Sequence, residues 1–141
     1  MLRRIKESDI EEIIELEKVT FSSTLGYSML HDAIYSTFTR AYVECDNDEI
    51  LGYISLTFDS EVIEIMNFCV KKEHQGQGIG YQLLKNVLNM LKQEGALRSI
   101  LEVRSKNERA INLYKKLGYK EIHRRIGYYD DDDALLLEKI L

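Results

Sequence analysis

The stretch that decides the fold is Val70-Lys71-Lys72-Glu73-His74-Gln75-Gly76-Gln77-Gly78-Ile79-Gly80, in which three glycines fall within five residues. A β-branched, apolar run over 62–70 leads into it, and an amphipathic pattern follows it. The segment is therefore predicted to connect a strand to a long helix. Glycines let backbone N–H groups approach a ligand closely, and a helix N-terminus attracts anions. A pyrophosphate is the ligand that this arrangement favours.

Two common nucleotide-binding motifs do not fit this turn. A dinucleotide-binding fingerprint has the spacing GxGxxG after the first strand of its unit. The glycines here are spaced Gly76-x-Gly78-x-Gly80 and follow the fourth predicted strand. A P-loop ends in Gly-Lys-Ser or Gly-Lys-Thr, and the sequence contains no such ending. The turn therefore belongs to another kind of phosphate site.

The hydrophobic periodicity outside the turn predicts blocks of strands and helices. Ser8-Asp9-Ile10-Glu11 has the pattern of a capping box, so a helix should begin there. Strands are predicted over 2–5, 41–45, 50–59, 62–70, 99–103, 119–128 and 134–140. Helices are predicted over 9–19, around 29–34, from Gly78 to Gly95 and over 107–117.

The resulting order is β-α-α-β-β-β-α-β-α-β-β. It predicts an α/β fold with a central mixed sheet and helices on both faces, because the strand–helix–strand steps 62–103 and 99–128 need right-handed crossovers. The chain has 141 residues and no shift of composition along its length. Residues 1–141 are therefore expected to form a single domain.

Charge and composition exclude several classes of function. There are 19 Lys and Arg against 24 Asp and Glu, a net charge of −5, so no direct binding of nucleic acid is expected. The N-terminal stretch turns acidic before any apolar run of signal-peptide length, and no 18-residue apolar run is present, so neither a signal peptide nor a membrane span is predicted. We therefore expect a cytoplasmic protein. Cys45 and Cys69 lack metal-ligand spacing, so they are expected to be reduced thiols, and no metal is expected.

Gln75-Gly76-Gln77-Gly78-Ile79-Gly80 matches the Q/R-x-x-G-x-G/A signature of the GCN5-related N-acetyltransferase (GNAT) family, and the order of elements is similar to that of the family. The resemblance implies that this turn, from Gln75 to Tyr81, binds the pyrophosphate of acetyl-coenzyme A (acetyl-CoA). It also implies that the preceding strand splays at a bulge, where Phe68-Cys69-Val70 offers backbone groups to the acetyl carbonyl. Asn107 resembles a family position that contacts the cofactor.

Within the family, the stretch from Leu101 to Tyr119 resembles the ribosomal-protein alanine N-acetyltransferase (RimI) group, as does Tyr128-Tyr129 followed by Asp133-Ala134. The resemblance implies an N-acetyltransferase that acts on a protein N-terminal amine. Residues 20–39 show little likeness to that group. An acetyltransferase acting on a small-molecule amine (a polyamine or an aminoglycoside) and a non-catalytic acyl-CoA-binding module therefore remain alternatives.

Glu102 is the candidate general base of such a reaction. It lies in a predicted strand among aliphatic residues, where an ionised carboxylate is rare unless it has a use. The period of two places it on the opposite face from Leu101 and Val103. The alternatives are an ion pair with Arg104, or Glu64 on the preceding strand as the base. An α-amine has a pKa near 8 and a Lys amine near 10.4, so a carboxylate base suits an α-amine better.

Tyr114 is the candidate general acid for the leaving thiolate, a role that the resemblance implies. It shares an apolar helical stripe with Ala110 and Leu117, so a core tyrosine is the alternative interpretation. Cys69 has no neighbouring base in the sequence to activate it, so direct transfer is expected rather than an acyl-cysteine. The run Asp130–Asp133 is expected to be a solvated hairpin loop, or else a site that attracts a cationic acceptor.

Overall fold

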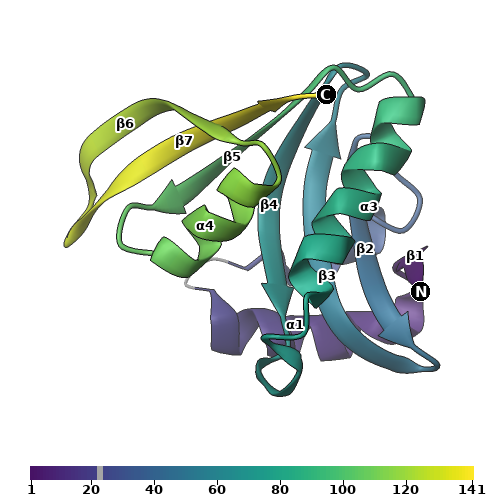
Figure 1. The fold of residues 1–141 in the computed structure, drawn as a ribbon. Helices are drawn as coiled ribbons and strands as arrows, with labels where there is room; N and C mark the ends of the chain where they lie inside the picture. Colours follow the sequence, from purple (N-terminus) through teal and green to yellow (C-terminus); the bar gives the residue numbers. More distant parts are fainter. Residues whose placement is uncertain (22–23) are drawn as a thin grey trace.

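The computed structural model describes residues 1–21 and 24–141, which form one seven-stranded mixed sheet (Figure 1). The strand order is β1-β2-β3-β4-β5-β7-β6, and only the β4–β5 pair is parallel. Ser22 and Ser23 lie outside the described residues. The strands are β1 (Leu2–Arg4), β2 (Thr39–Asp46), β3 (Glu49–Phe58), β4 (Val62–Val70), β5 (Arg98–Arg104), β6 (Lys120–Tyr129) and β7 (Asp132–Ile140).

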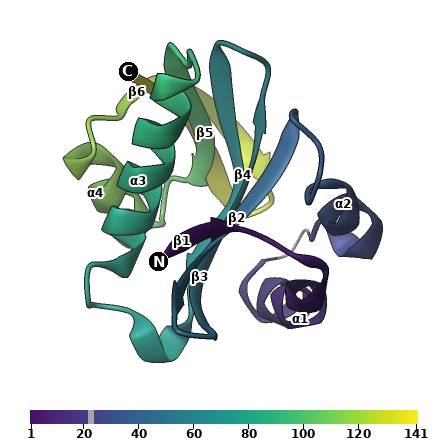
Figure 2. The same ribbon diagram turned by 90° about the vertical axis from the view of Figure 1, so that its right-hand side faces the viewer.

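The helices cover both faces of the sheet, as predicted (Figure 2). One face carries α3 and α4, and the other carries α1 and α2. Among the described residues, no helix is long and apolar enough to cross a membrane. The helices are α1 (Ile10–Thr20), α2 (Gly26–Asp32), α3 (Ile79–Gln93) and α4 (Glu108–Lys116), with short 3-10 turns at Glu7–Asp9 and Lys72–His74.

The predicted starts of the first two helices need correction. The start of α1 is held by Asp9, whose carboxylate accepts the backbone N–H of Lys6 at 2.9 Å and pairs with Arg3. The capping box predicted over Ser8–Glu11 is therefore in the wrong register, because a 3-10 turn precedes the helix. The second helix starts at Gly26, three residues before the apolar pattern that predicted it.

Each face of the sheet has its own hydrophobic core. The apolar stripe of α3 is fully buried against β3, β4 and β5, together with Tyr114 and Leu117 from the region of α4. On the other face, α1 buries Ile10, Ile13 and Leu16 against β2 and β3. The sheet is therefore the rigid layer that both pairs of helices share.

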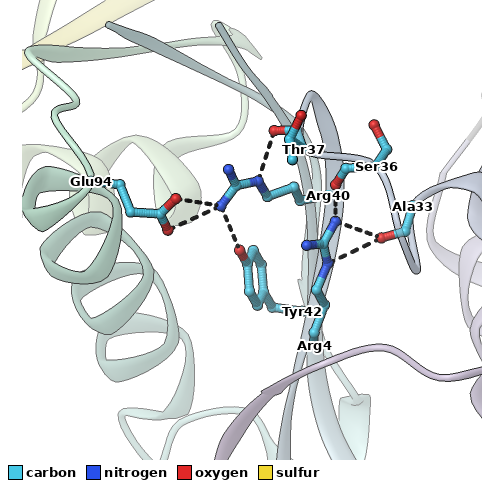
Figure 3. Close-up of polar contacts among 7 residues, drawn as sticks. All are labelled: Arg4, Ala33, Ser36, Thr37, Arg40, Tyr42 and Glu94. Carbon is cyan, nitrogen blue, oxygen red and sulfur yellow. Dashed lines mark hydrogen bonds and ion pairs between the residues drawn. The ribbon is translucent and has the colours of Figure 1, made fainter. Parts of the chain in front are cut away.

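Two arginines fasten the segment between α2 and β2 to this layer (Figure 3). Arg4 on β1 donates hydrogen bonds to the backbone carbonyl oxygens of Ala33 and Ser36. Arg40 on β2 reaches the opposite side and pairs with Glu94, at the end of α3, at 3.0 Å. These contacts tie the segment after α2 to β1 and the end of α3 to β2.

The parallel pairing of β4 with β5 is short, and this shapes the rest of the fold. The two strands pair only over Val62–Ile65 and Arg98–Leu101. On its other side, β4 pairs Ile65 with Leu56 and Asn67 with Ser55, so Met66 is the extra residue of a β-bulge. Beyond this separation point β5 continues with β7 and β6, away from β4 (Figure 1).

The aspartate run is not the solvated loop that the sequence predicted. Only Asp130 and Asp131 form the turn, because Tyr129 pairs with Asp132 in the β6–β7 ladder. Asp132 is buried and accepts hydrogen bonds from the Ser105 hydroxyl and from the backbone N–H groups of residues 106 and 133. Burial opposes its ionisation, but these hydrogen bonds outweigh that effect and lower its pKa.

Two more of these carboxylates also have partners in the protein. Asp133 accepts hydrogen bonds from the backbone N–H of Gly127 and from Arg124, and these bonds lower its pKa. Asp131 pairs with Arg104 at 3.1 Å. Most of the run therefore stabilises the hairpin and its junction with β5, and the short sequence pattern could not reveal these distant donors.

We predict that Asp132→Asn lowers the melting temperature at neutral pH, whereas Asp130→Asn, at an exposed turn position, changes it little. A carboxylate whose pKa is lowered by folding stabilises the fold at pH values above its unfolded-state pKa, about 3.9. This contribution is lost as the pH falls through the pKa of the folded state. The gap between wild type and Asp132→Asn should therefore shrink below about pH 4. Thermal melts of all three proteins between pH 7 and 3 measure this; equal melting temperatures at pH 7 would contradict it.

Candidate active site

A groove of about 890 Å³ runs between the end of β4, the start of α3 and the exposed side of α4. It gathers residues that are up to 96 positions apart in the sequence, from Thr20 at the end of α1 to Lys116 at the end of α4. The predicted cofactor-binding residues line it together, and they are Phe68, Cys69, Val70, Gln75, Gly76, Gln77, Gly78, Ile79, Gly80, Tyr81 and Asn107. Asn107 is also the N-cap of α4, since its side chain accepts the N–H of Ala110 at 3.2 Å.

The glycine turn presents bare backbone to this groove. Gly76 and Gly78 have φ angles of +81° and +80°, in the left-handed region that favours glycine, and a Cβ at either position would meet no protein atom within 4 Å. The first hydrogen bond of α3 runs from the N–H of Gln82 to the carbonyl of Gly78. The N–H groups of residues 79–81 therefore precede the helical ladder and are available to an anion.

The edge of β4 adds a second row of backbone groups. The N–H of Lys71 bonds to the carbonyl of Leu51 on β3, at 2.9 Å. Successive residues of an antiparallel strand point their backbone groups to alternate sides, so those of Phe68 and Val70 point away from β3. They lie past the separation point, where β5 no longer pairs with β4. The carbonyl of Val70 instead accepts the side-chain amide of Gln75, at 3.0 Å.

Sequence reasoning missed two cationic side chains of the groove. Arg109 and Lys116 on α4 line it, together with His74 before the glycine turn. The Arg109 guanidinium donates to the side-chain carbonyl of Gln75 at 2.7 Å and so joins the two walls. Arg109 and Lys116 are seven residues apart, two helical turns, on the same face as Asn112 and Leu113. This helical spacing could have indicated from the sequence that Arg109 and Lys116 lie on one face of α4.

Tyr114 and Cys69 occupy the buried part of the groove. Burial raises the pKa of the Tyr114 phenol to about 12, and its ring lies 6.2 Å from that of Phe68. Burial also raises the pKa of the Cys69 thiol to about 12. Since the thiolate is the nucleophilic form, Cys69 stays unreactive near neutral pH.

Glu102 is not among the residues that line the groove. It is the first residue of β5 past the separation point and lies on the face opposite the buried Leu101 and Val103. Its carboxylate accepts the Tyr129 hydroxyl at 3.1 Å and lies 3.7 Å from Arg125. Burial and this carboxylate raise the pKa of Tyr129. The ion pair of Glu102 is thus with Arg125 on β6, not with Arg104.

Glu64, the rival base, occupies a different environment. It lies within the paired part of β4, with Thr57 of β3 on one side and Ile100 of β5 on the other. Glu64 therefore precedes the point at which the two strands separate.

The residues of the groove fit acetyl-CoA. A diphosphate needs backbone N–H donors that no Cβ obstructs, and Gly76 and Gly78 leave that space clear. Cationic side chains border the same groove, and β4 offers an extended backbone edge for an amide-containing chain. Among the described residues, no cluster of His, Cys, Asp or Glu could hold a metal ion.

Comparison with known proteins gives the family. The model of the acetyltransferase (GNAT) family matches residues 9–119, and the chain belongs to this family. A Bacillus subtilis (strain 168) protein, provisionally named a ribosomal protein bS18-alanine N-acetyltransferase, is 30% identical over 139 residues. The aligned part covers 96% of this chain and 92% of that protein.

Solved structures show the same fold. The ribosomal-protein-S18-alanine N-acetyltransferase of Escherichia coli has a TM-score of 0.88 at 22% identity, covering 99% of this chain and 92% of that one. Arabidopsis thaliana Naa50, in complex with the bisubstrate analogue CoA-Ac-MVNAL, has a TM-score of 0.83 at 26% identity, covering 100% and 98%. The chain is therefore an acetyl-CoA-dependent N-acetyltransferase.

We predict that Gly78→Ala weakens acetyl-CoA binding at least tenfold, because the new methyl group enters the anion site and strains a left-handed residue. Gly95→Ala is the matched control, since Gly95 also has a positive φ, 109°, but lies at the other end of α3. Each tenfold loss of affinity removes about 1.4 kcal/mol of ligand-induced stabilisation at saturating acetyl-CoA. Thermal shift titration measures both variants, and an unchanged shift in Gly78→Ala would contradict the assignment.

Proposed function

We propose that this chain, acting as a single domain over residues 1–141, transfers the acetyl group of acetyl-CoA to the N-terminal α-amine of a protein. The observation that carries the proposal is the separation of β4 from β5 after Ile65 and Leu101. Past this point the donor groove reaches the sheet from the α3–α4 side, while Glu102 faces the α1–α2 side.

This arrangement supports direct transfer between the two faces. Acetyl-CoA supplies an activated acetyl thioester. Tyr114 lines the donor groove on one face, and Glu102 lies on the other, beside the β6–β7 hairpin. An amine that enters on the Glu102 side would meet the acetyl carbon where the strands part, while the thiol leaves on the Tyr114 side. The two proton transfers are then served by different residues from opposite directions.

Backbone groups of β4 would stabilise the charge that develops on the acetyl oxygen. The N–H groups of Phe68 and Val70 point away from β3, and the Phe68 ring lies 6.2 Å from the ring of the buried Tyr114. Fixed donors of this kind need no reorganisation during the reaction, so they can lower the barrier more than water can. They would take the role that the sequence resemblance implies for this strand, although the bulge itself lies earlier, at Met66.

Glu102 would act as the general base, directly or through a water molecule. Its bonds to Tyr129 and Arg125 orient the carboxylate at the edge of the separation point. Glu64 is flanked by strands on both sides, so it fits this role less well. Deprotonating an α-amine at neutral pH costs little, because its pKa is near 8. The pKa of a lysine side chain is about 2.5 units higher, so its deprotonation costs more.

Tyr114 would protonate the leaving thiolate. A pKa of about 12 keeps the phenol protonated at neutral pH. The same shift makes donation harder, since a thiol has a pKa near 8.5 and the difference corresponds to roughly 5 kcal/mol. The transfer must therefore accompany the breaking of the C–S bond rather than follow it.

Two observations favour a protein N-terminus as the acceptor. The Bacillus subtilis relative, aligned over nearly the whole chain, is named for a ribosomal protein alanine, and Naa50 was solved with a peptide joined to CoA. The aspartate run, which could have served as the counter-charge of a polyamine, is largely occupied by hydrogen bonds and ion pairs within the protein. The run therefore favours neither a polyamine nor a basic peptide as the acceptor, and the two relatives carry the proposal.

We predict that Glu102→Gln lowers kcat by roughly 10²–10⁴-fold while leaving acetyl-CoA binding unchanged. The loss should shrink above about pH 9, where the α-amine is neutral without help from a base. Tyr114→Phe should also lower kcat, but higher pH should not restore it. Glu64→Gln is the matched control and should keep kcat within a few-fold. A large loss in Glu64→Gln with full activity in Glu102→Gln would reverse the assignment.

We predict that peptides with N-terminal Ala or Ser release CoA thiol rapidly in the presence of acetyl-CoA. The same peptides with a blocked N-terminus and an internal Lys should not react, because the lysine amine stays protonated near neutral pH. Spermidine serves as the small-amine comparison. Rapid turnover of spermidine beside inert peptides would replace the proposed acceptor, and no thiol release with any amine would overturn catalysis.

A further inference from the structure

Glu17, near the end of α1, is a carboxylate in the apolar core of the α1–α2 face. Its exposed fraction is 0%, and it lies in the same layer as Ile13, Leu16 and Cys69. Burying a carboxylate costs several kcal/mol unless hydrogen bonds replace its hydration. An aliphatic side chain would fill this position at lower cost, so the polar contacts of Glu17 need an explanation.

Three donors from three different elements surround the carboxylate. The side-chain amide of Asn67 on β4 donates to Oε2 at 2.8 Å, and the Tyr53 hydroxyl on β3 donates to the same oxygen at 3.3 Å. The backbone N–H of Leu25, the N-cap residue of α2, lies 3.3 Å from both oxygens. Glu17 therefore connects α1 and the start of α2 to the two central strands.

The position of Asn67 links this cluster to the active site. Asn67 directly follows the bulge residue Met66. Asn67 on β4 and Glu102 on β5 therefore both lie just past the point at which these strands separate. Asn67 contacts α1, and Glu102 lies opposite the α3–α4 core, so both side chains are on the α1–α2 face. Asn67 and Glu102 thus flank the same place from two strands.

Glu17 also decides the orientation of the Asn67 amide. A carboxylate can only accept hydrogen bonds, so Asn67 must turn its NH₂ end toward Glu17. The carbonyl oxygen of the amide then remains at the other end of the group, and Asn67 itself is only half-buried. A fixed carbonyl oxygen at this place is suited to accept a hydrogen bond from an amine.

We propose that Asn67 binds the acceptor amine through its side-chain carbonyl oxygen, and that Glu17 is the positioning residue that holds the amide in this orientation. The proposal rests on the proposed function, since it assigns the acceptor side of the same site. Glu17 itself does not touch the acceptor, because it is fully buried behind Asn67.

A double-mutant cycle on acceptor kinetics tests the proposal. Asn67→Ala should raise the KM of the acceptor roughly tenfold or more, as expected for a lost hydrogen bond to a charged or charge-developing group. Glu17→Ala should raise it similarly, and Glu17→Gln, which keeps one accepting oxygen, should restore most of the loss. If Glu17 acts through Asn67, the double variant Glu17→Ala/Asn67→Ala should be no worse than Asn67→Ala alone. Fully additive losses would overturn the proposal.

Two controls separate positioning from a loss of folding. The affinity of each variant for acetyl-CoA, measured by thermal shift titration, should stay within twofold of the wild-type value. The reason is that the donor groove does not include Glu17 or Asn67. Glu15→Ala, at an exposed position two residues earlier, should leave all parameters unchanged. If Glu17→Ala does not fold, Tyr53→Phe decides instead, because its buried hydroxyl cannot touch the acceptor and should still raise the KM severalfold. If the single variants Tyr53→Phe and Asn67→Ala both fold and both leave the acceptor KM unchanged, the proposal is overturned.

The acceptor in these assays is whichever amine the wild-type enzyme acetylates. If peptides are inert and spermidine reacts, the proposed protein acceptor fails, while the cycle measured with spermidine still tests Glu17 and Asn67. If peptides react and the cycle is additive, the proposed function stands and this inference fails.

Discussion

Parallel pairing between β4 and β5 ends at Ile65 and Leu101, and backbone groups beyond this point must find hydrogen bonds elsewhere. One of them, the carbonyl of Val70, takes a side-chain amide from the glycine turn. The bulge at Met66 shifts the register of β4 at the same level. A sheet edge exposed in the middle of the molecule is costly to leave unpaired, and it is also a ready template for an extended ligand. The groove, the proposed base Glu102 and the proposed acid Tyr114 are all arranged around it.

The two sides of this gap in the sheet differ in their electrostatics. On the α3–α4 side, bare helix N–H groups and the cations Arg109 and Lys116 suit a phosphorylated donor. On the α1–α2 side, Glu102 and, in the proposed orientation, the side-chain carbonyl oxygen of Asn67 present acceptors of hydrogen bonds, which suit an amine. Groups that suit an anion and groups that suit an amine lie only a few residues apart in the sheet, because successive side chains of a strand point to opposite faces.

Two buried carboxylates, Glu17 and Asp132, join segments that are distant in the sequence. Glu17 joins two helices to β3 and β4, and Asp132 joins the β6–β7 hairpin to the residues after β5. A carboxylate offers several acceptor positions, so it can satisfy donors from several directions at once. The apolar cores supply most of the driving force for folding, whereas these groups select one arrangement of the hairpin and of the helix ends.

The sequence by itself determined the order of the elements, the phosphate turn and the faces of β5. These features depend on local periodicity and on glycine positions, which act over a few residues and can be read directly. It also grouped the donor residues from Phe68 to Tyr81, because they are contiguous in the chain. Only the tertiary structure decided that Glu102 lies outside the donor groove, that most of the aspartate run is occupied, and that Arg109 and Lys116 border the groove. It alone gave Glu17 its donors, which are 8 to 50 positions away in the sequence. Partners at such separations are set by strand pairing and helix packing, and a local pattern of residue types carries no record of them.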